Sequence, residues 1–150
     1  MAIQDLGLRT PHTIEPLASA RVAVERMEKD GIGCLVVVDG KRPVGVVTDR
    51  DLVLHVLVGK RDARLVRVGE IAKRSPVTVS ATATLAEVTR AMRTHGVRRL
   101  PVVDEHGELV GLVALDDLLR RVATEIGDLA EALRHQFSGE IGAASAPRRT

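Results

Sequence analysis

Two short stretches of the chain, at positions 35–38 and 100–103, are almost uninterrupted runs of aliphatic residues, most of them β-branched. Runs of this length and composition predict strands buried on both faces. Each run is followed by a short polar segment that ends in Gly40 or Gly107, which is typical of a hairpin turn. The strands predicted to return lie at 44–47 and 109–113.

An amphipathic helix is predicted before each of these hairpins. Apolar residues recur there at helical spacing, as Ala20, Ala23, Val24 and Met27 in the first half and as Leu85, Val88, Ala91 and Met92 in the second. Ser19 and Thr84 are the expected N-caps, and Glu87 completes a capping box with Thr84. Gly31 and Gly96 fit the C-terminal ends of the two helices.

Further elements complete each half. A leading segment at 3–8 or 68–73 is followed by a proline, Pro11 or Pro76, and by a short strand near 13–14 or 77–79. A second helix closes each half, at 50–58 and from 115 to about 134. The order β-α-β-β-α therefore occurs twice, which indicates an α/β fold with small sheets covered by helices.

The two halves are copies of one segment. Residues 3–39 align with 68–104 at a constant offset of 65, and after one inserted residue the match resumes at an offset of 66. Matching pairs include Met27/Met92, Gly31/Gly96, Leu35/Leu100, Asp39/Asp104, Gly45/Gly111 and Asp51/Asp117. A repeat of this length is a whole supersecondary unit. We expect the two units to be related by a pseudo-two-fold axis, with the functional cleft between them.

The repeat gives the expected domain boundaries. Repeat 1 covers 1–60, a linker with the leading segment of repeat 2 covers 61–74, and repeat 2 covers 75–122. An extended C-terminal helix at 123–137 and a disordered tail at 138–150 follow. The apolar residues of that helix, from Leu118 to Leu133, form a face that must be buried. Either the helix packs on its own core, or it meets a partner helix in a dimer.

Composition narrows the function. The net charge is only +2, so the chain has no strong positive potential that would attract nucleic acid or acidic membranes. It has one Phe and no Trp or Tyr, so it lacks the aromatic side chains on which the bases of single-stranded nucleic acid stack. The single cysteine, Cys34, stands in an apolar run and is expected to be a buried hydrophobe. The five histidines lack zinc-ligand spacing. We expect a cytoplasmic protein without a metal site or a membrane span.

The residues from Gly45 to Asp51 carry the candidate chemistry. A glycine allows close approach to the backbone, and a threonine and an aspartate follow at the start of the closing helix, three residues apart. Backbone N–H groups at a helix start suit a phosphate, and a carboxylate suits a ribose diol. Helix capping by Thr48 and first-turn acids alone is the structural alternative.

With the duplication, this turn and the strand ending in Asp39 or Asp104 resemble the CBS domain family, named after cystathionine beta-synthase. The resemblance covers residues 3 to about 122, and two such domains form a Bateman module. It implies regulatory binding of AMP, ADP, ATP or S-adenosylmethionine between the repeats, with no catalytic residues and no catalytic cofactor.

The resemblance also implies two ligand sites. Site 1 combines Gly45, Thr48, Asp51, Pro76, Val77, Thr78, Val97, Arg98 and Arg99. Site 2 combines Pro11, His12, Thr13, Ile32, Gly33, Gly111 and Asp117. In site 2 the threonine position is Ala114, and Gly33 and Cys34 stand at the arginine positions, so we expect site 2 to be weak. Charge-assisted arginine–phosphate bonds favour site 1.

The sequence therefore predicts a non-enzymatic sensor of adenine nucleotide, a homodimer that signals to an unidentified protein partner. Two rivals remain in view: a dimerisation scaffold without ligand, and a nucleic-acid binder that uses Arg90, Arg93, Arg98 and Arg99. An enzyme is disfavoured because no nucleophile and base can be assembled from the motifs.

Overall fold

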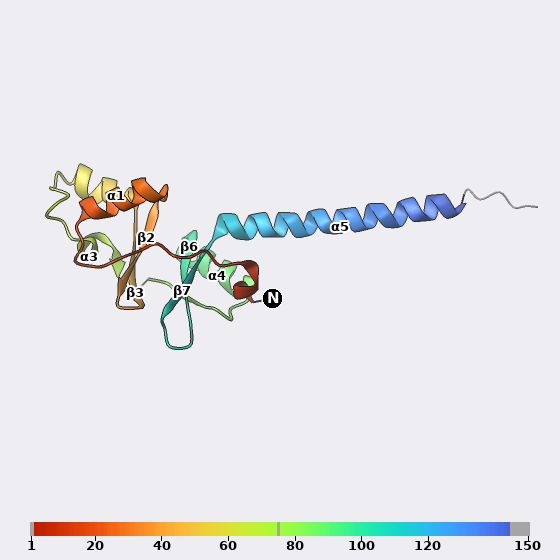
Figure 1. Ribbon diagram of the computed structural model, residues 1–150, viewed down its shortest axis with the longest axis horizontal. Helices are drawn as coiled ribbons and strands as arrows, with labels where there is room; N and C mark the ends of the chain where they lie inside the picture. The colour runs from red at the N-terminus through yellow and green to blue at the C-terminus, as the bar shows by residue number, and fades with distance from the viewer. Residues whose placement is uncertain (1, 75, 145–150) are drawn as a thin grey trace, which may run out of the picture. The chain divides into compact units, whose positions relative to one another are not determined.

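The computed structural model describes residues 2–74 and 76–144, which fall into two compact units, Met1–Leu115 and Asp116–Thr150. Within the described residues, the first unit holds two β-sheets and the helices that cover them, and the second unit is one long helix (Figure 1). The α/β fold with two copies of one unit is therefore confirmed.

The strands form a four-stranded sheet in the order β1-β2-β3-β4 and a three-stranded sheet in the order β5-β6-β7. The first sheet contains β1 (Thr13–Ile14), β2 (Cys34–Asp39), β3 (Arg42–Thr48) and β4 (Lys73–Arg74), and the second contains β5 (Val79–Ser80), β6 (Arg99–Val103) and β7 (Leu109–Ala114). In each sheet the short first strand runs parallel to the next, and the predicted hairpin is antiparallel. Gly40 and Gly107 adopt positive φ in the two hairpin turns, as those turns require.

The helices are η1 (Ile3–Leu6), α1 (Ala20–Asp30), α2 (Asp49–Leu52), the π-helix η2 (Val53–Val58), α3 (Val68–Ile71), α4 (Leu85–His95) and α5 (Leu115–Ala144). The predicted caps are confirmed. Ser19 accepts a hydrogen bond from Val22 N, and Thr84 forms a capping box with Glu87. Gly31 and Gly96 end α1 and α4 in the left-handed conformation.

Several boundaries differ from expectation. The helix expected at 50–58 begins at Asp49 and widens into a π-helix at Val53, a change of hydrogen-bonding partner that no sequence period signals. The strand expected at 77–79 starts at Val79, because only Val79 and Ser80 pair with β6. Val24, expected in the buried stripe of α1, is 47% exposed.

The C-terminal helix is longer than predicted. α5 continues to Ala144, so residues 138–144 are helical instead of belonging to a disordered tail. This stretch contains no proline that would break the helix, and Pro147 lies beyond it. The remainder of the expected tail, 145–150, lies outside the described residues, as does Ser75 before Pro76.

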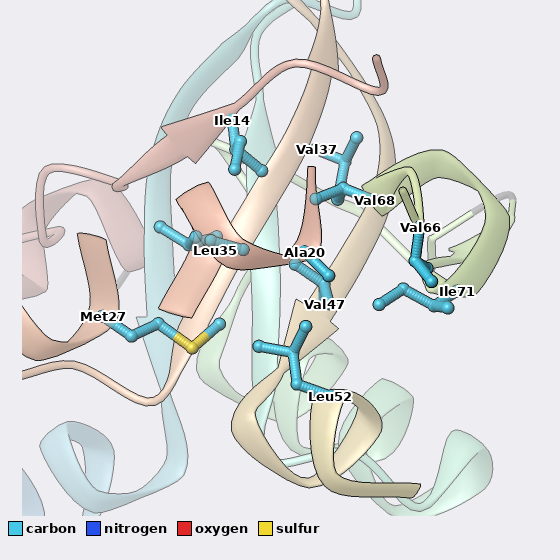
Figure 2. Close-up of a cluster of buried hydrophobic side chains, with 11 residues drawn as sticks. Ile14, Ala20, Met27, Leu35, Val37, Val47, Leu52, Val66, Val68 and Ile71 are labelled. Atoms are coloured by element: carbon cyan, nitrogen blue, oxygen red, sulfur yellow. The ribbon is translucent and has the colours of Figure 1, made fainter. Parts of the chain in front are cut away.

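The hydrophobic core of the first sheet contains side chains from beyond repeat 1 (Figure 2). Leu35, Val37 and Val47 from β2 and β3 pack there with Val66, Val68 and Ile71, which belong to the linker and the leading segment of repeat 2. Backbone hydrogen bonds fix this segment, from Ala20 N to Val66 O at 2.8 Å and from Val68 N to Ala18 O at 2.8 Å. The linker therefore completes the core of repeat 1.

The N-terminal segment makes the reciprocal contact with repeat 2. Ile3 N donates to Ala83 O at 2.9 Å, and Arg9 forms a bridge with Leu112 of β7. A Cβ on Gly111 would lie 2.8 Å from Leu8 Cδ1, so the glycine allows this close packing. Each leading segment thus pairs with the other repeat's sheet, an exchange that ties the two halves of the first unit together.

Candidate functional site

A cavity of about 710 Å³ lies where the two repeats meet inside the first unit. Repeat 1 contributes the end of β3 and the start of the helix that follows, and repeat 2 contributes the end of α4 and the start of β6. The lining residues are Cys34, Val46, Thr48, Asp49, Arg50, Asp51, Leu54, Pro76, Val77, His95, Gly96, Val97, Arg98, Arg99, Leu100 and Pro101.

Thr48 and Asp51 form a capping box on the cavity wall. Asp51 Oδ2 accepts hydrogen bonds from Thr48 N and from Thr48 Oγ1, both at 2.9 Å, and Asp51 N donates to Thr48 Oγ1 at 3.2 Å. These bonds hold the half-buried carboxylate in one orientation. Among the described residues, Asp51 Oδ1 receives no hydrogen bond, so this oxygen is available to an outside donor.

The backbone N–H groups at this helix start are already engaged, which corrects one expectation. Asp49 N donates to Gly33 O at 3.1 Å, and Arg50 N donates to Asp49 Oδ1 at 2.8 Å. With Asp51 N bound to Thr48 Oγ1, these three amides have partners within the chain. These three amides are therefore not free to bind a phosphate.

Arginine side chains supply the positive charge on the opposite wall. Gly96 ends α4 with φ of 62°, which turns the chain toward β6. Arg98 O then accepts from Leu115 N at 2.9 Å, and Arg99 pairs with Ala114 at the start of β6. Within the part of the chain that the structure describes, the exposed guanidinium groups of Arg98 and Arg99 form no ion pair or hydrogen bond.

Charges of both signs meet near Cys34. Burial raises the pKa of this thiol, the positive charge of Arg99 opposes that rise, and the carboxylates of Asp49 and Asp51 add to it. Cys34 is a buried free cysteine, as expected, and its raised pKa disfavours the reactive thiolate.

Seven of the nine residues expected in site 1 line this one cavity, and Gly45 and Thr78 do not. Gly45 is buried in the middle of β3, where it pairs with Val37 on one side and Arg74 on the other. The sequence reasoning missed Cys34, Asp49 and His95, among others. The hairpin register could have indicated Cys34, because it lies directly opposite Thr48.

Three of the residues expected in site 2 have contacts within the chain, and site 2 itself stays a prediction. His12 Nδ1 lies 3.2 Å from Asp30 Oδ2, and Thr13 O accepts from Arg26 Nη1 at 2.7 Å. The first unit also contains the other residues expected in site 2 that precede α5, namely Pro11, Ile32, Gly33 and Gly111. Asp117 lies on α5 in the second unit, where its Oδ1 accepts from Arg120 Nη2 at 3.3 Å.

At the position matching Arg98, a Cβ on Gly33 would lie 3.0 Å from Asp49 Oδ2. A side chain there would meet a carboxylate instead of open space. Across the described residues, no three His, Cys, Asp or Glu side chains are grouped to hold a metal ion. No helix among them has both the length and the apolar character that crossing a membrane requires.

Known proteins resemble this chain in sequence. The chain is 31% identical to an uncharacterised protein of Methanopyrus kandleri over 142 residues, 94% of this chain and 72% of that protein. It is 38% identical to hypoxic response protein 1 of Mycobacterium tuberculosis over 101 residues, 67% of this chain and 70% of that protein.

Solved structures resemble this chain in fold as well. A CBS domain protein from Pyrobaculum aerophilum complexed with AMP matches with a TM-score of 0.72 at 31% identity, covering 83% of this chain and 99% of that one. Hypoxic response protein I with two coordinated zinc ions matches with a TM-score of 0.72 at 32% identity, covering 81% and 98%. The family model for the CBS domain matches residues 3–58 and 68–124. The chain therefore belongs to the CBS domain family, and it carries two of these domains in tandem, as a Bateman module does.

Proposed function

We propose that this protein is a regulatory module that binds one adenine nucleotide, or S-adenosylmethionine, in the 710 Å³ cavity between its repeats. The observation that carries the proposal is that this single cavity joins the Thr48–Asp51 capping box to the unpaired Arg98 and Arg99. The role is binding, with no bond made or broken.

The two walls divide the ligand between them. Asp51 Oδ1 accepts hydrogen bonds from the ribose hydroxyls, while Thr48 holds the carboxylate in place through Oδ2. Arg98 and Arg99 bind the phosphate, since the backbone amides of the helix start are occupied. Arg50, on the same cavity, adds a third cation. Apolar lining at Val77, Leu100 and Pro101 suits the flat base.

A relative supports the choice of ligand. The protein from Pyrobaculum aerophilum, 31% identical, was solved with AMP, and a second structural relative at 29% identity was also solved with AMP. Both match this chain over more than four fifths of its length. AMP is therefore the first ligand to test.

Site 2 is proposed to be weak or empty. Gly33 and Cys34 stand where repeat 2 has its arginines, and Ala114 stands where repeat 1 has Thr48. Without cations or the hydroxyl, a nucleotide phosphate there lacks charge-assisted partners. We expect one bound ligand per chain.

The module is proposed to act as a homodimer that passes the signal to a protein partner. A ligand that contacts both walls of the cavity favours arrangements in which the repeats lie close together. It can shift that equilibrium only by its difference in affinity for the two arrangements. The partner then responds to the surface that the shift exposes or covers.

A thermal-shift screen tests the proposal. Purified full-length protein is melted with AMP, ADP, ATP, S-adenosylmethionine and GMP, since a ligand that binds only the native state raises the melting temperature. We expect an adenosine ligand to raise it, and Asp51→Ala to lose the shift through a drop in affinity of about 10- to 100-fold, the usual size for a charged hydrogen bond.

Glu87→Ala is the matched control. Glu87 forms the same capping box with Thr84 that Asp51 forms with Thr48, but it does not line the cavity. Both variants lose a helix cap, and only Asp51→Ala is expected to lose the ligand response. No shift with any ligand would favour the dimerisation scaffold. A response to DNA in place of nucleotide, abolished by salt, would favour the nucleic-acid binder.

A further inference from the structure

The long helix α5 carries an exposed apolar seam, formed by Leu119, Val122, Ile126, Leu129 and Leu133. Each of these side chains is between 37% and 67% exposed, and Phe137 continues the apolar surface one turn further. A row of large apolar side chains in solvent marks an interaction surface. The seam belongs to the second unit, and the residues that line the cavity belong to the first.

The spacing of the seam indicates what covers it. Its members follow one another at intervals of 3, 4, 3 and 4 residues, an average of 3.5. An ordinary amphipathic helix on a globular core has a period near 3.6 and a wider stripe. A strict period of 3.5 keeps a narrow seam facing one partner helix and is the pattern of a left-handed coiled coil.

The flanks of the seam suit an identical helix. In the heptad set by Leu119 and Val122, the flanking positions from 123 to 132 are Ala123, Glu125, Ala130 and Ala132. A second copy brings the same charges to the interface, so flanks that carry charges of one sign would repel each other. Three alanines and one glutamate avoid this repulsion and let two helices approach closely.

Several charged residues of α5 form ion pairs within the helix. Arg121 Nε lies 3.1 Å from Glu125 Oε1, and Arg134 Nη2 lies 2.8 Å from Glu131 Oε2. These i,i+3 and i,i+4 pairs place opposite charges side by side, so the paired residues form no stripe of one sign that would attract nucleic acid or an acidic protein. The apolar seam is therefore the part of this helix that a partner would bury.

The family match stops inside this helix. The CBS model ends at residue 124, and α5 continues to Ala144, so 20 helical residues (144 − 124) follow the conserved module. Ile126, Leu129 and Leu133 all lie in this addition. Leu119 and Val122 lie within the matched residues, so the seam begins in the second domain and continues beyond it.

We propose that the seam of α5 pairs with the same seam of a second copy of this chain, forming a short coiled coil. With five seam positions, the pairing covers about two and a half heptads, so it is expected to be reversible and to depend on protein concentration.

Sedimentation of the full-length protein across a concentration series tests the pairing. The wild type is expected to change from monomer to dimer, and Ile126→Glu is expected to weaken the association at least tenfold by placing a charge in the seam. Thr124→Glu is the matched control, because it adds the same charge on the outer face two residues away. Equal association of all three proteins would overturn the proposal, including the case of a dimer held through the first unit.

Disulfide trapping tests the same contact directly. Cys34 is the only cysteine and is buried, so a cysteine introduced on α5 reports on that helix alone. Leu119→Cys and Leu133→Cys are each expected to form a self-linked dimer if the helices run parallel, or to link only with each other if they run antiparallel. Thr124→Cys should stay unlinked. Failure of every seam cysteine to link, with a monomeric wild type, would mean that α5 folds back on its own chain.

Discussion

Asp51 combines two tasks at the scale of one residue. One carboxylate oxygen accepts from the backbone N–H and hydroxyl of Thr48, and the other has no hydrogen-bond partner among the described residues. The local sequence Thr-x-x-Asp explains the cap, which is why capping alone was a reasonable alternative. The tertiary structure adds Arg98 and Arg99 across the cavity, and this combination turns a cap into a candidate ligand site.

Acid sensitivity can be predicted at the same scale from Glu87. Hydrogen bonds from the backbone N–H and the hydroxyl of Thr84 lower the pKa of Glu87 below its usual 4.5. A group whose pKa is lower in the folded state contributes stability above its unfolded value, and that stability disappears as the pH falls through the folded value. We expect urea-unfolding free energies between pH 6 and pH 3 to fall less steeply for Glu87→Gln than for wild type. Parallel profiles would contradict this.

The two repeats differ most at the scale of the element. α1 and α4 have the same length, the same type of N-cap and the same left-handed glycine end, so the local rules act equally on both copies. The closing helices diverge: repeat 1 ends in a four-residue α2 and a π-helix, whereas repeat 2 ends in the 30-residue α5. The two repeats therefore share the central hairpin and the first helix, and they differ in the closing helix.

Gly127 gives a prediction at this scale. It lies on the outer face of α5, one residue after Ile126, and a Cβ built there meets nothing within 4 Å. Gly127→Ala is therefore expected to stabilise the helix by about 1 kcal/mol without steric conflict. Circular dichroism of the full chain should show more helix retained on heating. Gly96→Ala is a contrasting variant, because φ of 62° makes alanine unfavourable there.

The exchange of leading segments organises the first unit as a whole. Ile3 packs with repeat 2, and its repeat counterpart Val68 packs in the core of repeat 1. Each segment comes just before its own repeat in the chain, yet pairs with the sheet of the other. The two repeats are therefore coupled by backbone hydrogen bonds and by core packing as well as by the cavity between them.

This coupling predicts cooperative unfolding. Ile3 and Val68 are both fully buried, so Ile3→Ala is expected to cost about 2–5 kcal/mol and Val68→Ala about 2 kcal/mol. Because each segment links the repeats, both variants should lower one common unfolding transition of the first unit. Urea unfolding followed by the circular dichroism of the amides, and thermal unfolding followed by calorimetry, would show this common transition. Two separate transitions, one per repeat, would refute the coupling.

The sequence by itself determined the elements and the duplication. Buried strands, capping boxes and glycine helix ends follow from residues within a few positions of one another. The cap formed by Thr84 and Glu87 and the helix end at Gly96 could therefore be predicted from the sequence. The likeness of the two halves also followed from the sequence, and the resemblance to the CBS domain family implied seven of the residues that line the cavity.

Only the tertiary structure decided which segments meet. The exchange of leading segments, the occupied amides at Asp49 and Arg50, and the place of Cys34 and His95 on the cavity wall all depend on partners far along the chain. Pairing between distant segments depends on strand edges and core volume, which local periodicity does not encode. For this reason the sequence predicted the parts of the candidate ligand site, and the fold determined how those parts are joined.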